Sequence, residues 1–255
     1  FSAVMSSSAT DRILYPVTRK GDTKDDYHGT VIADPYRWLE DDNSDETKAW
    51  VKAQNAVTFE YLRSLPKREE SKKRLMDLWN YARVGRPFHQ RGRWFYSQNS
   101  GLQNQSVLYT ALSLEAEPKV LLDPNAMSAD GTVSLSDYTP SEDGTLLAYA
   151  TSSAGSDWSE VRVRDIEKGT DLTDHIRWVK FSGISWMKDG SGFFYSRYDE
   201  PKKGAALTQK NEFHKLYFHK LGTPQAEDRL IYERRDEPEW GFGGSVTEDG
   251  KYLII

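Results

Sequence analysis

The sequence predicts a mainly β fold, an incomplete β-propeller preceded by a helical segment. A tight turn followed at once by aromatic and aliphatic residues occurs four times, with turn glycines at Gly92, Gly144, Gly190 and Gly250. Successive glycines are 52, 46 and 60 positions apart. A hairpin turn that recurs every ~40–50 residues is typical of propeller blades, which bury their faces only against one another.

The rest of each repeat has room for four strands. In the middle repeat, residues 160–164 alternate, with Val161 and Val163 on one face and arginines on the other, as in a half-buried strand. Residues 184–187 precede a turn as an inner strand, and residues 229–232 suit a short last strand. The alternative is a β-sandwich, whose turns come every ~8–12 residues without a longer period.

Before the blades, up to about Asn80, the pattern is helical. Asn43 or Ser44 can cap a helix whose apolar residues recur at helical spacing until Pro66. Residues 68–80 predict a second helix with a charged, solvated face. We expect the aromatic segment 34–41 (DPYRWLED) to pack on another surface, and we assign no structure to the polar stretch 1–8.

Composition excludes several classes of function. The net charge is −5 with both signs interspersed, so we expect no nucleic-acid or anionic-membrane partner. The sequence has no cysteine, which removes disulfides and thiolate chemistry and fits either the cytoplasm or a bacterial periplasm. No apolar run approaches the ~20 residues of a membrane span.

Several motifs resemble one known family of serine peptidases, the prolyl oligopeptidases. They extend from about Tyr15 to Ile255 and are long enough to be specific. Among relatives in the same clan, the segment WLED is more similar to the proline-specific enzymes than to oligopeptidase B, which cleaves after Arg or Lys. The motifs are residues 27–29 (YHG), 34–41 (DPYRWLED), 49–55 (AWVKAQN), 155–158 (GSDW), 179–182 (VKFS), 216–223 (LYFHKLGT) and 236–240 (DEPEW).

The resemblance implies a seven-bladed propeller paired with an α/β-hydrolase domain that carries a Ser-Asp-His triad. Such enzymes cleave short peptides after proline, and their propeller keeps folded proteins out. Residues 1–80 would then pack on the hydrolase domain, and residues 81–255 would form about three blades and the start of a fourth. We expect short proline-containing peptides as substrate, the hydrolase domain of the same protein as partner, and a monomer when intact.

No catalytic residue can be assigned in this chain. A nucleophile elbow needs Gly-x-Ser-x-Gly, and the sequence contains no such pentapeptide. The nearest match, residues 243–247 (GGSVT), lacks the last glycine, so we reject Ser245 as nucleophile. The resemblance places the triad C-terminal to Ile255. Residues 251–255 stop inside an apolar strand, so we expect the N-terminal part of a longer polypeptide that is inactive alone.

Other binding chemistry is sparse. The five histidines are scattered, so we predict no metal site, and glycines 241–244 precede no helix that would bind a phosphate. We predict no cofactor and leave the substrate-binding residues unknown. Four tryptophans either line a peptide tunnel or pack between blades, and packing between blades is the preferred interpretation. They are Trp158, Trp178, Trp186 and Trp240. A competing hypothesis is a catalytically silent propeller that serves as a binding scaffold.

Overall fold

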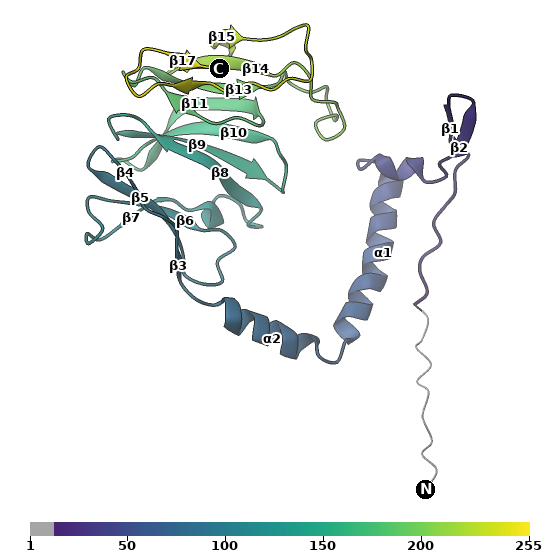
Figure 1. Cartoon of the computed structure of the whole chain (residues 1–255). Coiled ribbons are helices and arrows are strands. Elements are labelled where there is room, and N and C mark those ends of the chain that lie inside the picture. The colour runs from purple at the N-terminus through teal and green to yellow at the C-terminus, as the bar shows by residue number, and fades with distance from the viewer. Residues whose placement is uncertain (1–12) are drawn as a thin grey trace. The chain divides into compact units, whose positions relative to one another are not determined.

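A computed structural model describes residues 13–255, so the polar stretch 1–8 lies outside the described residues. The chain divides into two compact units, one ending at Leu78 and one running from Trp79 to Ile255 (Figure 1). The first unit carries the helices and the second nearly all strands. In the described part of the chain, no helix is both long and apolar enough to cross a bilayer.

The first unit begins with a two-stranded hairpin, β1 (Lys24–Tyr27) and β2 (Thr30–Ala33). Its turn uses two left-handed residues, His28 and Gly29, with φ of 56° and 91°. The side chain of Asp26 accepts a hydrogen bond from the Gly29 amide and closes this turn. A short 3₁₀ helix, η1 (Arg37–Glu40), follows the hairpin.

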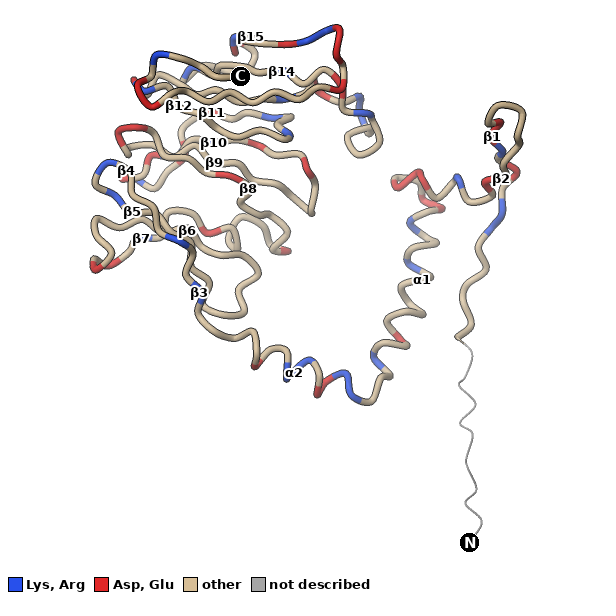
Figure 2. Tube along the Cα trace, in the orientation of Figure 1, with Lys and Arg blue, Asp and Glu red and all other residues tan. Residues whose placement is uncertain are grey.

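Two helices complete this unit, α1 (Asp45–Ser64) and α2 (Arg68–Trp79). The hydroxyl of Ser44 accepts a hydrogen bond from the Thr47 amide at 3.1 Å, so Ser44 is the N-cap of α1. Thr47 is the single buried residue of α1, and α2 has none. Acidic and basic positions are mixed along α2 (Figure 2). These helices are therefore specified by interactions between residues close in sequence, and most of their apolar side chains are exposed.

The first blade is an antiparallel sheet in which two short strands, β3 and β4, pair with the same neighbour, β5. Together they occupy the place of one inner strand that is interrupted between residues 84 and 88. The sheet continues outward through β6 and β7. The strands are β3 (Arg83–Val84), β4 (Phe88–Gln90), β5 (Arg93–Asn99), β6 (Val107–Ala111) and β7 (Lys119–Leu122).

The second and third blades follow the same order of four antiparallel strands. A single bridge, Val179↔Arg197, joins their backbones. The second blade contains β8 (Val133–Pro140), β9 (Leu146–Ser153), β10 (Ser159–Asp165) and β11 (Thr170–Val179), and the third contains β12 (Ser185–Trp186), β13 (Gly192–Arg197), β14 (Lys215–Lys220) and β15 (Arg229–Tyr232). Two short 3₁₀ helices, η2 (Pro124–Ala126) and η3 (Gln225–Glu227), lie in connections.

A last hairpin, β16 (Ser245–Val246) with β17 (Leu253–Ile254), begins a fourth blade. The predicted arrangement of about three blades and the start of a fourth is therefore confirmed, and the β-sandwich alternative is wrong. The four turn glycines that predicted the blades all have positive φ, from 69° to 80°. In the last three turns the glycine amide donates to the backbone oxygen three residues earlier, at 2.9–3.0 Å.

The hydrophobic core lies between blades. One cluster joins the second and third blades through Val161, Val163, Ile176, Phe193 and Tyr195. A second cluster joins the first and second blades through Phe95, Leu108, Leu122, Leu147 and Tyr149. The predicted alternation in this strand thus has a structural meaning. Val161 and Val163 face one blade interface, and the neighbouring arginines face the other side of the sheet.

Candidate functional surface on the second and third blades

The two ends of the blade strands differ in backbone strain. The register pairs Ser159 with Ser152 and with Val179, and it pairs Arg197 with Val179 and with Lys215. One edge of the two blades therefore contains the end of β9, the start of β10, the ends of β11 and β13, and the start of β14. Of the six non-glycine residues with left-handed backbone in the described part of the chain, four lie at this edge: Ala154, Trp178, Phe181 and Phe213.

Left-handed backbone costs such residues about 1–3 kcal/mol each and is often found at functional sites. The opposite edge of the same blades carries ordinary glycine turns, for example at Gly144 and Gly190. Strain concentrated at one edge marks that edge as the candidate functional surface. We define this candidate surface by Trp158, Trp178, Lys180, Phe181 and the residues that line the two cavities beside them.

Aromatic rings and one lysine form the centre of the candidate surface. The Lys180 ammonium lies 4.9 Å from the centroid of the Trp158 ring and 5.3 Å from that of Phe181. Trp158 meets Trp178 edge to face, with 5.6 Å between ring centroids. Lys180 is almost fully buried, whereas Phe181 is 68% exposed. An exposed phenylalanine on a strained backbone is costly in water and is suited to contact a ligand.

Two open cavities of about 320 Å³ each lie beside these rings. The first cavity is lined by Trp158, Trp178, Glu160 and Arg177, together with several serines. The second is lined by Asp137, Lys180 and Phe181 among others. Burial raises the pKa of Asp137, although backbone amides of Tyr138 and Ile184 donate to it and oppose the shift.

The third blade supports the backbone of Lys180 through His214. The Nε2 atom of His214 lies 3.0 Å from the Lys180 carbonyl oxygen, and Nδ1 accepts a hydrogen bond from the Phe242 amide. These partners fix the neutral tautomer that carries its proton on Nε2. Burial lowers the pKa of His214, which is consistent with that neutral form. His214 is therefore part of the packing under the surface.

The four predicted tryptophans separate into three environments. Trp186 is buried and donates to the Thr139 oxygen of the neighbouring blade at 2.9 Å, so the packing interpretation is confirmed for it. Trp158 and Trp178 line a cavity, and Trp158 also donates to the Ala206 oxygen of the third blade at 2.7 Å, which supports packing between blades. Trp240, just before the start of the fourth blade, is 49% exposed and lies under Arg234. Sequence reasoning did not single out Phe181, because a left-handed backbone at a non-glycine residue leaves no sequence signal.

The remaining candidates show no chemistry of their own. Ser245 lies in a two-residue strand paired with β17. Within residues 13–255, no three or more His, Cys, Asp or Glu side chains come together in a way that could hold a metal ion. The candidate surface offers aromatic faces, serine hydroxyls, the cations of Lys180 and Arg177, and carboxyl groups such as those of Asp137 and Glu160.

The fold and this surface define a β-propeller domain with one edge that combines backbone strain with aromatic side chains. The chain belongs to the prolyl oligopeptidase family, because the family model described as the prolyl oligopeptidase N-terminal β-propeller domain matches residues 15–255. Prolyl endopeptidase of Elizabethkingia meningoseptica is 44% identical over 253 residues, which are 99% of this chain and 36% of the relative. Prolyl oligopeptidase A of Amanita bisporigera is 36% identical, with 100% of this chain and 37% of the relative covered.

Solved structures agree with the sequence relatives. A prolyl endopeptidase structure matches with a TM-score of 0.85 at 33% identity, over 94% of this chain and 36% of its own. Prolyl oligopeptidase B from Galerina marginata, solved with a 35-residue hydrolysis and macrocyclisation substrate, matches with a TM-score of 0.81 at 34% identity and the same coverage. The chain thus spans little more than a third of the length of the relatives it matches.

Proposed function

We propose that this chain is the N-terminal part of a serine endopeptidase that cleaves short peptides after proline. The observation that carries the proposal is the 44% identity to a prolyl endopeptidase over 253 residues. The matched region and the motifs that carry the resemblance both extend over the two units of the chain. The role of residues 81–255 in the proposal is to restrict access, so that short flexible peptides enter and folded proteins do not.

The catalytic triad of the proposed enzyme lies C-terminal to Ile255. The absence of a Gly-x-Ser-x-Gly pentapeptide from these 255 residues supports this placement. A serine hydroxyl would attack the carbonyl carbon of the proline residue while a histidine takes the hydroxyl proton and an aspartate orients the imidazole. This chain would contribute binding: the exposed Phe181 ring would contact apolar peptide side chains, and Lys180 would lie near peptide carbonyl oxygens.

Residues 1–80 would support the hydrolase domain in this proposal. Large apolar side chains of α1 and α2 are exposed, including Phe59 (51%), Leu75 (58%) and Trp79 (59%). Helices with so little buried surface gain stability by packing on another domain. The proposed occupant of these faces is the α/β-hydrolase domain of the same protein, and the intact protein would be a monomer.

Three peptide substrates test the proposal with the full-length protein. We expect turnover of a chromogenic peptide with proline before the scissile bond. We expect no turnover of its arginine counterpart, and slow or no cleavage when the proline peptide is embedded in a folded protein. Preference for arginine would instead indicate an oligopeptidase B-like enzyme, and no turnover of any peptide would indicate a binding scaffold.

A Phe181→Ala variant should raise KM several-fold with little change in kcat if the ring contacts substrate.

A further inference from the structure

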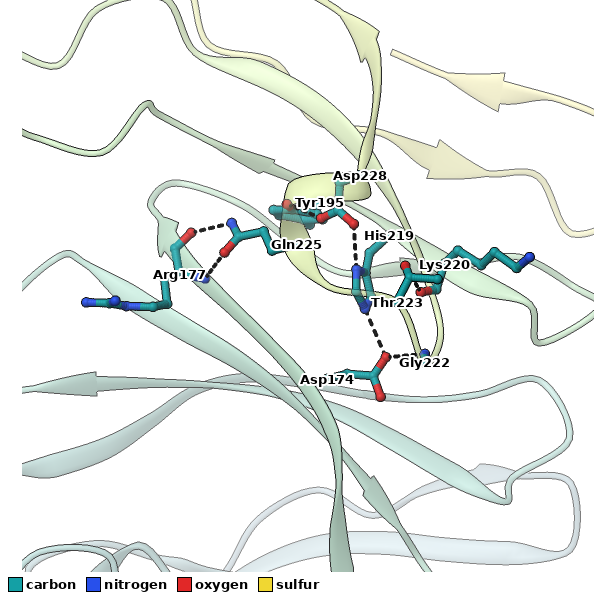
Figure 3. A network of polar contacts seen from close by, with 9 residues as sticks. All are labelled: Asp174, Arg177, Tyr195, His219, Lys220, Gly222, Thr223, Gln225 and Asp228. Carbon is teal, nitrogen blue, oxygen red and sulfur yellow. Dashed lines mark hydrogen bonds and ion pairs between the residues drawn. The ribbon is translucent and has the colours of Figure 1, made fainter.

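A buried polar network joins the second and third blades, whose strands are linked by the single backbone bridge Val179↔Arg197 several residues away. His219 of β14 lies between two aspartates, Asp174 of β11 and Asp228 just before β15 (Figure 3). Its Nε2 atom is 2.9 Å from Asp174 and its Nδ1 atom is 2.7 Å from Asp228. The side chains of all three residues are at most 1% exposed.

Each aspartate also accepts a hydrogen bond from a second donor. Asp174 accepts a hydrogen bond from the Gly222 amide at 2.7 Å, and Asp228 accepts one from the Tyr195 hydroxyl at 2.6 Å. Both ring nitrogens of His219 face carboxylate oxygens, so this geometry suits an imidazolium ring that donates to both. Other charges nearby are Arg197 of β13, which acts on Tyr195, and Lys220, the next residue along β14.

A second contact holds the same strand three residues further on. The side-chain amide of Gln225, in η3, donates to the Arg177 carbonyl oxygen at 2.9 Å and accepts from the Arg177 amide at 3.0 Å. One side chain thus replaces the two hydrogen bonds that a neighbouring strand would make (Figure 3). The Arg177 side chain lines a cavity of the candidate surface, and strained Trp178 is the next residue.

We propose that Asp174, His219 and Asp228 form a charged latch between blades that, with Gln225, positions Arg177 and Trp178 in the candidate surface. Its bearing on peptide binding rests on the proposed function, whereas the latch itself does not. Burial alone would lower the pKa of His219, but its hydrogen bonds to Asp228 and Asp174 outweigh burial and raise that pKa. The folded state therefore keeps this proton to higher pH, so the stability that it contributes is complete below about pH 6.5, the ordinary histidine pKa, and is lost as pH rises through the raised pKa.

Ring ¹⁵N spectra of the histidine-labelled, unmodified protein test the charged form directly. At pH 6.5, the ordinary histidine pKa, we expect both His219 nitrogens to be predominantly protonated. The isosteric Asp174→Asn variant should lower the pH at which His219 loses its proton. A predominantly neutral His219 ring at pH 6.5 would overturn the proposal, and this measurement needs no variant that could fail to fold.

Hydrogen exchange of the Arg177 amide tests the positioning role. In His219→Gln we expect that amide to exchange at least ~10-fold faster, because local opening exposes it. The matched control is His175→Gln on the same strand, which removes a half-exposed histidine bonded to Glu160 at 2.7 Å. The control should change the exchange rate less than twofold, and equal rates in the two variants would contradict a latch. A protein with this latch and no proline-specific turnover would refute only the proposed function.

Discussion

The two units of this chain obtain their structure from different sources. In β13, five of the six residues are buried, and two of them, Phe193 and Tyr195, pack against the second blade. In α1, one residue of twenty is buried, and a side-chain cap defines its start. The propeller unit is thus specified by contacts between distant residues, whereas the helical unit is specified by neighbours in sequence. Substitutions of the same kind should therefore have unequal effects in the two units.

The largest difference is expected for a phenylalanine in each unit. Phe193 is fully buried between blades, and Phe59 is 51% exposed on α1. Phe193→Ala should lower the free energy of unfolding of the propeller unit by about 3–5 kcal/mol, because it leaves a cavity in the core. In the 255-residue chain alone, Phe59→Ala should change the free energy of unfolding of the helical unit by less than ~0.5 kcal/mol, since an exposed side chain loses little packing. Urea unfolding followed by tryptophan fluorescence measures both, and similar losses would contradict the contrast.

A glycine in each unit gives the next largest effect. A methyl group at Gly192 would lie 2.0 Å from the His219 carbonyl oxygen, whereas one at Gly29 meets nothing within 4 Å. Gly192→Ala should destabilise the propeller unit by roughly 1–3 kcal/mol or more through overpacking. Gly29→Ala should cost only about 1 kcal/mol, because φ is positive there. Thermal unfolding of the two variants would rank them, and a smaller loss for Gly192→Ala would be the contrary result.

Alkaline pH should weaken the propeller through Tyr149. Burial, with a hydrogen bond to Asp171, raises the pKa of Tyr149 to about 12. A raised pKa means that the folded state holds the proton longer, so this stability is complete below about pH 10, the ordinary tyrosine pKa, and falls until about pH 12. At pH 11 we expect Tyr149→Phe to remove on the order of 1 kcal/mol of that pH dependence.

Urea unfolding of both proteins at pH 9 and pH 11 gives the comparison for Tyr149. Absorbance at 295 nm, recorded on the same samples, reports when the buried phenol ionises. If Tyr149→Phe kept the full loss of stability between these two pH values, the pH dependence would have to arise from another group.

The smallest effect is expected at the cap of α1. Ser44→Ala removes the hydroxyl that accepts from the Thr47 amide, and should cost about 0.5–1 kcal/mol of helix stability. Ser44→Asp should restore it, since aspartate also caps and favours the helix N-terminus. Circular dichroism at 222 nm measures the loss of helix. A drop as large as that from Phe193→Ala would mean that α1 folds together with a larger core.

Much of the fold was predictable because it follows from short-range rules. Gly92, Gly144, Gly190 and Gly250 marked the blades, since a tight turn with positive φ favours glycine and the flanking strands alternate in polarity. Ser44 and Pro66 predicted where α1 begins and ends for similar local reasons. The strand alternation also placed Val161 and its arginine neighbours on opposite faces, as the blade interfaces confirm.

By itself, then, the sequence determined the blade repeat, the helices and the family motifs, because turns, caps and alternation act over a few residues. Only the tertiary structure decided which polar groups meet: Asp174 and His219 are 45 residues apart, and neither carries a local sign of its partner. It also decided that Phe181 is both strained and exposed. Contacts across a blade interface depend on how whole sheets stack, so no local pattern can encode them.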